Sequence, residues 1–388
     1  MIILAIETSC DETAAAIIDI SGRKEKTRLK ILANIVASQV NLHRQYGGIV
    51  PEVAARAHLE QIMPTLNEAF HQARLTKDKI DLIGVTNGPG LITSLLVGAE
   101  TAKTLSYILN KPLLGINHLA GHFYAAFANL FLAKETLKNK EIFPAVGLIV
   151  SGGHTELVLM KNWYQFQKLG QTLDDAAGEC FDKIAKFLNL GYPGGPAIAA
   201  MANQHKFTTN FTNKNNSREF ANKFVNISDI QLPRPMLTTR DFNFSFSGLK
   251  TAVLYFLKDK KNSQLTQNDV FISNFCGEVQ RAAIDVLISK TLKAARRFDA
   301  KSIILGGGVA ANQELRKQFK LKIENCLSAE DLAQAGKLKI NFLVPPKNLC
   351  TDNALMIAVA TYFRWQKMVK KQKLPNWQQI KVDPNQSI

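Results

Sequence analysis

The chain has 388 residues, of which 46% are hydrophobic and 21% charged. This balance is typical of a globular protein, and the length allows two domains that each bury a core. The longest apolar runs have only the length of a strand, which argues against a membrane span. The start of the chain resembles neither a secretory nor a mitochondrial leader, so we expect a cytoplasmic protein.

The net charge is +16, which favours a polyanionic partner such as RNA. Lys and Arg side chains that neutralise phosphates release condensed counterions, and this drives such binding. The alternative is a chain whose loops are merely rich in lysine. The cysteines number five. This odd count, with no Cys-x-x-Cys pair, excludes a cysteine-based zinc finger and favours reduced thiols over a disulfide framework.

The first 133 residues alternate between patterns typical of strands and of helices. We expect strands at 2–6, 14–18, 31–36, 80–85 and 112–116, and helices at 52–75, at 91–109 and directly after 117. A polar turn at 7–13 joins the first two strands, and a glycine turn at 86–90 precedes the long second helix. This order predicts an α/β domain with a largely parallel sheet that opens with an antiparallel hairpin.

The same plan recurs after a charged stretch at 134–141, which we interpret as an interdomain linker. Strands are expected at 145–150, 156–160 and 302–305, turns at 151–155 and 306–308, and helices at 271–297, 311–320 and 354–365. We therefore predict an internal duplication. The expected parts are a first domain (1–133), a second domain (142–351) with insertions at 204–232 and 254–268, a helix at 352–366 that returns to the first domain, and a basic tail (367–388), frayed or bound to a partner.

His118 and His122 stand four residues apart where a helix is expected to begin. Residues at this spacing share a helix face, so both imidazoles could bind one metal ion, although such a pair also arises by chance. Asp352, at the start of the last helix, is a candidate third ligand or else a helix cap. The zincin protease pattern would require glutamate at the position of Leu119 as the general base, and its absence argues against a metalloprotease.

Glycine turns at 151–153 and 306–308 occupy equivalent places in the repeated plan and predict a site for a nucleotide phosphate, although glycine also serves ordinary turns. Asp182 is a candidate to bind a ribose hydroxyl, whereas Asp175 and Glu179 of the same acidic cluster can belong to a solvated helix face. The segment 191–196 is dense in Gly and Pro and predicts a loop. The alternation over 242–248 predicts a half-buried strand whose aromatic residues pack in the core or stack on a base.

Several of these stretches together resemble the TsaD (Gcp) family of tRNA N6-adenosine threonylcarbamoyltransferases. They are residues 6–13, 46–52, 118–122, 150–155, 244–250 and 350–353, within a resemblance that runs from Ile2 to about Ala360. It implies the α/β actin/Hsp70/sugar-kinase (ASKHA) fold, in which two duplicated domains enclose a nucleotide cleft. It also implies transfer of a threonylcarbamoyl group from threonylcarbamoyl-AMP to N6 of the adenosine that follows the anticodon in tRNAs reading A-starting codons.

The resemblance further implies roles for individual residues. His118, His122 and Asp352 would hold one Fe²⁺ or Zn²⁺ ion, a choice that this donor set leaves open. The adenylate would contact Ile149, Val150, Ser151, Gly152, Gly153, Asp182, Gly195 and Asn312. Ala199 stands where many members carry an aspartate that contacts the ribose. The implied partners are a TsaB-like paralogue and a TsaE-like ATPase, with a TsaC-like enzyme that makes the adenylate.

The implied reaction acylates a weakly nucleophilic amine with an activated donor, so the protein mainly supplies positioning and charge stabilisation. We hypothesise that the metal polarises the threonylcarbamoyl carbonyl while the glycine turns hold the AMP leaving group. Asp11, at the tip of the first hairpin, is the candidate to accept the N6 proton, with Glu12 as second choice. The alternatives are an ATPase or sugar kinase of the same fold and a non-catalytic tRNA-binding scaffold.

Overall fold

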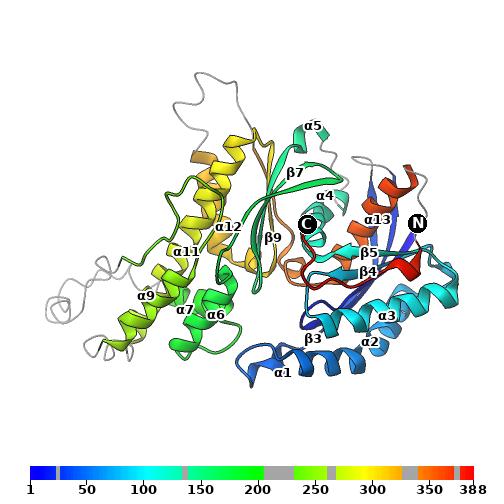
Figure 1. Ribbon diagram of the computed structural model, residues 1–388, viewed down its shortest axis with the longest axis horizontal. Helices are drawn as coiled ribbons and strands as arrows, with labels where there is room; N and C mark the ends of the chain where they lie inside the picture. Colours follow the sequence, from blue (N-terminus) through cyan, green and yellow to red (C-terminus); the bar gives the residue numbers. More distant parts are fainter. Residues whose placement is uncertain (23–26, 133–138, 205–230, 260–267, 326–339, 371–375) are drawn as a thin grey trace.

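A computed structural model describes residues 1–22, 27–132, 139–204, 231–259, 268–325, 340–370 and 376–388 (Figure 1). It contains two five-stranded sheets with helices around and between them. Most of the predicted linker at 134–141, most of the insertion at 204–232, the second half of the insertion at 254–268 and part of the basic tail lie outside these residues.

The first sheet has the strand order β3-β2-β1-β4-β5. Its strands are β1 (Ile2–Glu7), β2 (Glu12–Ser21), β3 (Arg28–Ser38), β4 (Leu82–Gly88) and β5 (Leu113–Asn117). The pairs β1–β2 and β2–β3 are antiparallel, whereas β1–β4 and β4–β5 are parallel. The predicted antiparallel hairpin at the start of the sheet is therefore confirmed, but the sheet is mixed rather than largely parallel, because β3 adds a second antiparallel pair.

The second sheet has the order β10-β9-β6-β7-β8 and repeats the first when read from β8. Its strands are β6 (Ala145–Val150), β7 (Thr155–Asn162), β8 (Gln165–Gln171), β9 (Ser302–Gly306) and β10 (Asn341–Leu343). The pairs β6–β7 and β7–β8 are antiparallel, and β6–β9 and β9–β10 are parallel. This confirms the duplicated α/β plan, although the sequence reasoning missed β8 and β10. Strand β10 has only three residues, and β8, with seven, contains too many polar residues to indicate a buried strand.

Helices pack on both faces of each sheet. On the first sheet, α2 (Pro51–Ala73) and α3 (Ile92–Leu109) cover the outer face, and α1 (Val40–Arg44) precedes them. Between the sheets lie α4 (His118–Leu132) and α13 (Ala354–Lys370) (Figure 1). The second sheet is covered by α6 (Ala177–Phe187), α7 (Gly194–Gln204), α9 (Ser247–Lys258), α11 (Asp269–Arg297) and α12 (Gln313–Asn325), while α5 (Asn139–Ile142) leads into β6.

The alternation of side chains along a strand explains this layering. In β1, Leu4 and Ile6 join the core under α2 and α3, while Ile3 and Ala5 join the core that contains α4 and α13. Ile149 of β6 reaches the same central core from the second sheet. The two halves therefore share one apolar layer, into which both α4 and α13 are packed.

Three local expectations are wrong. The segment 242–248 is not a strand: Phe244 makes one isolated bridge to Thr172, and α9 begins at Ser247. Its aromatic residues do pack in the core, because Phe244 and Phe246 are fully buried. The predicted loop at 191–196 ends early, since α7 starts at Gly194. Residues 254–258, expected in a charged connection, form the last turn of α9.

The tail beyond residue 367 was expected to be frayed or bound to a partner, and the first of these alternatives is wrong for its described part. Helix α13 continues to Lys370, and residues 376–388 pack on the first domain. Trp377, at the start of the 3-10 turn η8 (Trp377–Gln379), lies edge-on to Tyr107 at a ring-centroid distance of 5.9 Å. None of the described helices combines the length and the apolar character that crossing a membrane requires.

Gly147 tests the packing of α4 on the second sheet. A Cβ atom there would lie 2.0 Å from the ring of Phe123, which projects from α4. We expect Gly147→Ala to destabilise the fold by about 1–3 kcal/mol through overpacking. Gly277, within α11, is the matched control, because no described atom lies within 4 Å of its ideal Cβ position. Gly277→Ala is expected to stabilise the helix by about 0.5–1 kcal/mol. If calorimetry showed that both substitutions shift the melting temperature in the same direction, this packing of α4 on the second sheet would be contradicted.

Candidate active site

The start of α4 brings the two histidines together. Strand β5 ends at Asn117 and α4 begins at His118. The Asn117 side chain caps the helix, because its Oδ1 accepts a hydrogen bond from the backbone N–H of Ala120 at 3.0 Å. The rings of His118 and His122 have centroids 4.8 Å apart and stand nearly perpendicular. Both side chains are buried, so the predicted pair forms on one helix face turned away from solvent.

Asp352 joins this pair from the far end of the chain. Its Oδ1 lies 3.4 Å from Nε2 of His118 and 3.2 Å from Nε2 of His122. The next residue, Asn353, caps α13 by accepting a hydrogen bond from the N–H of Met356 at 3.1 Å. Because Asn353 serves as the cap, the carboxylate of Asp352 is left to face the histidines.

These three side chains fit a divalent metal ion. One nitrogen or oxygen from each lies within 4.8 Å of the others. Both ring nitrogens of His122 are buried, and no described group makes a well-aligned hydrogen bond to either, although Asp352 is close to Nε2. A buried imidazole without a hydrogen-bond partner is costly unless something else binds it. Two imidazoles and one carboxylate are a donor set that Fe²⁺ and Zn²⁺ both accept.

Glu7 is a fourth member of the centre that the sequence reasoning missed. It is fully buried at the end of β1, and its Oε2 lies 3.1 Å from Nδ1 of His118. The same carboxylate accepts hydrogen bonds from the backbone N–H of Ser9, at 2.6 Å, and from the hydroxyl of Thr86. A carboxylate on Nδ1 fixes the ring so that Nε2 faces the metal position. The available signal was a glutamate directly after an apolar strand, where a buried charge is costly unless paired.

The charges of the centre are strongly coupled. Burial alone would lower the pKa of His118, but Asp352 and Glu7 together raise it well above its usual value. Burial would likewise raise the pKa of Asp352, yet the two histidines hold it far below the usual range. When no metal is bound, the two carboxylates therefore favour the protonated form of His118. Metal binding must displace that proton.

The first hairpin turn lies beside this centre. The backbone carbonyl of Asp11 accepts a hydrogen bond from the N–H of Gln39 at 2.9 Å, which ties the turn to the end of β3. Burial raises the pKa of Glu12 well above its usual value, with further contributions from the charges of Asp11 and Asp352. Asp11 also acts electrostatically on Asp182 and Tyr192 of the second domain. The turn thus faces both the metal centre and the other domain.

The two glycine turns of the second domain meet at the same place. A Cβ on Gly307 would lie 2.4 Å from the carbonyl oxygen of Val150, and one on Gly306 would lie 3.1 Å from that of His122. The turn after β9 therefore packs against the end of β6 and against α4. No described atom lies within 4 Å of an ideal Cβ on Gly152, Gly153 or Gly308. Their backbone is open to a ligand, as the anion hypothesis requires.

The other predicted contact residues surround these turns. Asp182 uses Oδ1 to accept a hydrogen bond from the N–H of Gly194 at 2.6 Å, so it caps α7 at the turn that contains Gly195. Asn312 caps α12 by accepting from the N–H of Leu315 at 3.0 Å. Ile149 and Val150 are fully buried, and their side chains belong to the core. Ser151 binds the N-terminal turn of α6, where its carbonyl accepts from the N–H of Gly178 at 3.1 Å.

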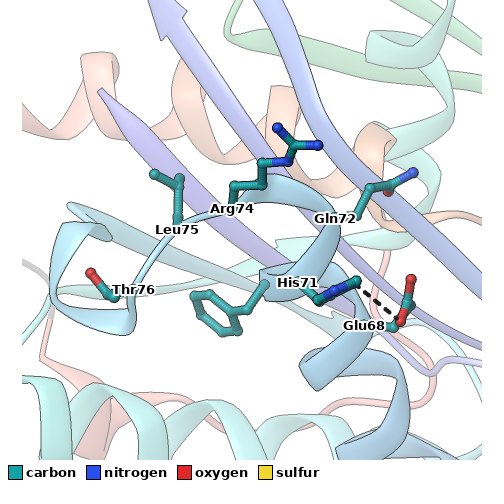
Figure 2. A pocket seen from close by; sticks show the side chains of 7 residues that line it. Glu68, His71, Gln72, Arg74, Leu75 and Thr76 are labelled. Carbon is teal, nitrogen blue, oxygen red and sulfur yellow. Dashed lines mark ion pairs between the residues drawn. The ribbon is translucent and has the colours of Figure 1, made fainter.

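A separate hollow lies at the C-terminal end of α2 (Figure 2). It is lined by Glu68, Phe70, His71, Gln72, Arg74, Leu75 and Thr76. The imidazole of His71 is 3.9 Å from the carboxylate of Glu68, and both side chains are largely exposed. None of the predicted site residues lines this hollow, so it takes no part in the candidate centre.

His154, in the turn after β6, gives a pH test of this environment. Burial, with the charges of His118 and His122, lowers its pKa to about 4. The unfolded chain takes up this proton below about pH 6.5, whereas the folded protein does so only near its lower pKa. Folded stability therefore falls as the pH drops through this window, by on the order of 2 kcal/mol at about pH 5.

We expect His154→Gln to remove this loss. In urea unfolding of the metal-free protein with a chelator, the free energy of unfolding of the variant should rise relative to that of the wild type as the pH falls. His71→Gln is the matched control, because the His71 side chain is 85% exposed. Equal pH profiles for His154→Gln and the wild type would show that His154 titrates normally.

Comparison with known proteins agrees with this architecture. The sequence profile described as TsaD, tRNA N6-adenosine threonylcarbamoyltransferase, matches residues 30–359. The crystal structure of T. kodakarensis HypF aligns over 95% of this chain and 48% of that chain, with a TM-score of 0.54. At 14% identity this likeness concerns the fold alone.

Two full-length relatives carry the same name as the profile. The tRNA N6-adenosine threonylcarbamoyltransferase of Syntrophomonas wolfei is 43% identical, covering 94% of this chain and 92% of its own. That of Bacillus subtilis is 43% identical, covering 95% and 92%. With the duplicated fold and the motifs already described, these matches show that the chain belongs to the TsaD family of tRNA N6-adenosine threonylcarbamoyltransferases.

Proposed function

We propose that this tRNA-modifying transferase holds one divalent metal ion, Fe²⁺ or Zn²⁺, between His118, His122 and Asp352. The observation that supports this most is the convergence of one ring nitrogen from each histidine and one carboxylate oxygen, all within 4.8 Å of one another, in a buried site. We further propose that threonylcarbamoyl-AMP is the acyl donor and binds along the glycine turns. This rests on Gly306, which packs against His122 and so brings a phosphate-binding turn next to the metal ligands.

The proposed reaction is an acyl transfer from the adenylate to the tRNA base. N6 of the tRNA adenosine forms a bond to the carbamoyl carbon, the bond from that carbon to the AMP oxygen breaks, and N6 loses one proton. A metal ion bound at the centre would supply Lewis-acid chemistry toward a carbonyl oxygen. Backbone N–H groups of Gly152, Gly153 and Gly308 bind the phosphate of the leaving group.

The N6 proton goes to the first hairpin turn. Asp11 is the proposed acceptor, since it acts on groups of both domains and its turn lies beside Asp352. Glu12 remains second choice: burial raises the pKa of its carboxyl, but its Oε1 already accepts a hydrogen bond from the hydroxyl of Ser38 at 3.2 Å. Proton transfer to a positioned carboxylate typically contributes 10²–10⁴-fold in rate, by order of magnitude.

The substrate is tRNA, and we propose that the modified base is the adenosine following the anticodon in tRNAs that read A-starting codons. The net charge of +16 supports binding of a polyanion. We also propose a TsaB-like paralogue and a TsaE-like ATPase as partners. Exposed apolar residues on adjacent helices offer a docking face for such a subunit: Leu59 and Met63 on α2, Ile92 and Leu96 on α3. The free thiols among the described cysteines fit a cytoplasmic location.

Substitution of the metal ligands tests the proposed centre. We expect His118→Ala and Asp352→Asn to lose bound metal and to lower tRNA modification by more than about 100-fold, because Lewis-acid stabilisation contributes several kcal/mol. The measurement is mass spectrometry of tRNA nucleosides after incubation with threonylcarbamoyl-AMP, with and without the partner subunits, alongside elemental analysis. His71→Ala, an exposed histidine, is the control. Full modification by His118→Ala would favour a scaffold role for the centre.

Substitution in the hairpin turn tests the proton acceptor. We expect Asp11→Ala to lower single-turnover transfer by about 10²–10⁴-fold while metal and AMP binding stay intact. Glu12→Gln should have the smaller effect. The reverse order would assign the proton to Glu12, and near-normal turnover in both variants would remove the turn from the chemistry.

A further inference from the structure

Residues 381–388 form a segment that the transferase reaction does not explain. They follow η8 and lie beyond residues 30–359, which the family profile matches. Trp377 and Ile380 pack on the core under α3, and Ile388 packs on the central core. Figure 1 shows the segment, in red, running along β4 and β5 toward the start of α4. The segment is anchored at both ends and crosses the edge of the first sheet at the carboxyl end of β5, directly before His118.

On the β4 side, the segment satisfies backbone groups that the sheet leaves open. The pairing of β4 with β5 is irregular between Thr86 and Gly88. The carbonyl of Asn87 instead accepts a hydrogen bond from the N–H of Asp383 at 2.8 Å, and its side-chain amide donates to the carbonyl of Lys381 at 2.9 Å. A Cβ on Gly88 would lie 2.0 Å from the carbonyl oxygen of Asp383. The end of β4 is therefore shaped to the segment.

On the β5 side, one amide group joins the segment to α4. Oδ1 of Asn117 caps the helix, as described above, and its Nδ2 faces the segment. That Nδ2 donates to the carbonyl and the side-chain oxygen of Gln386 at 3.4 and 3.3 Å, and to the carbonyl of Ser387 at 3.3 Å. The next residue in the chain is His118. The contact with the segment thus acts directly on the residue that orients the first turn of α4.

A second route reaches the other ring nitrogen of His118. The carbonyl of Pro384 accepts a hydrogen bond from the N–H of Gly90 at 3.2 Å. A Cβ on Gly90 would lie 2.5 Å from the carbonyl oxygen of Ser9, which also accepts from the N–H of Leu91. The hydroxyl of Ser9 lies 3.1 Å from Nδ1 of His118. The segment therefore supports His118 from the helix cap and from the turn that holds its Nδ1.

We propose that residues 381–388 are a positioning element of the metal centre. They hold the ends of β4 and β5 and the cap of α4 so that the imidazoles meet Asp352 in binding geometry. This inference rests on the proposed metal site. Among the described residues no hydrogen bond or ion pair joins the segment to the three proposed ligands, so it acts through Asn117 and Ser9. Groups that orient metal ligands in this way typically change metal affinity by 10–100-fold, by order of magnitude.

Deletion of residues 381–388 tests the proposal. We expect the Zn²⁺ dissociation constant of the otherwise full chain to rise by about 10–100-fold, measured by competition with a chelator. Amide hydrogen exchange of Ala120 and Gly121 should accelerate, while that of α11 stays unchanged. A synthetic peptide covering residues 381–388, added in trans, should restore both. Unchanged affinity together with unchanged exchange would overturn the proposal.

Asn117→Ser keeps the test decisive if the deletion variant fails to fold. Serine is an equally good helix cap but lacks the Nδ2 donor, so the variant separates the cap from the contact with the segment. We expect the same direction of change in Zn²⁺ affinity and in exchange. Asn385→Ala is the matched control, because the Asn385 side chain is exposed. The hydrogen bond described for this residue is donated by its backbone N–H to Oδ1 of Asp383 at 3.0 Å, and the substitution keeps it.

Hydrogen exchange also separates this proposal from the metal site. A wild-type chain that binds Zn²⁺ no better than His118→Ala would contradict the metal site. In that case faster exchange of the first turn of α4 on deletion would show that the segment positions this turn, but not that it positions a metal centre. Unchanged exchange in both the deletion and Asn117→Ser would overturn the positioning role.

Discussion

The carboxylate of Asp352 lies between two imidazoles at the point where both halves of the molecule meet. Charges are costly to bury, and a buried cluster persists only when each member is paired. Here Asp352 faces His118 and His122, and Glu7 faces the other side of His118. A protonated His118 provides that pairing without metal, and a divalent ion would take over the role of the proton. The need to pair these buried charges thus also constrains how α4 and α13 pack together.

Close approach of backbones makes this meeting possible. Gly121 lets α4 cross α13, since a Cβ there would lie 2.9 Å from Ile357. Gly147 lets the ring of Phe123 approach the second sheet, and Gly306 lets the turn after β9 reach the backbone of His122. The first domain supplies the histidines and the hairpin turn, and the second supplies the glycine turns. In the proposed site the two copies therefore have different parts: the first provides the two histidines, and the second provides the open backbone proposed to bind an anion.

The segment after α13 adds a further constraint from outside the part matched by the family profile. Its contacts run to Asn87, Gly90 and Asn117, all at the carboxyl ends of parallel strands or just beyond them. Ligand sites of open α/β sheets lie at this edge, where loops leave backbone groups unpaired. Occupying those groups with a segment of the same chain stiffens the edge next to the site.

The sequence by itself determined much of the fold, because its evidence is local. Apolar periodicity placed β1, β6, α2 and α11 within a few residues, and the repeated order of turns showed the duplication. The spacing of His118 and His122 placed both rings on one helix face before any tertiary contact was known.

Only the tertiary structure decided how distant residues share the site. It assigned the helix cap to Asn353 and left Asp352 to the histidines, and it placed Glu7 behind His118. It also packed residues 376–388 onto the first domain, where composition had suggested a frayed tail. The physical reason is the same in each case. Burial, charge pairing and backbone hydrogen bonding depend on which distant residues become neighbours in the fold. Glu7 and His118 are 111 positions apart, and no local sequence pattern indicates that they are in contact.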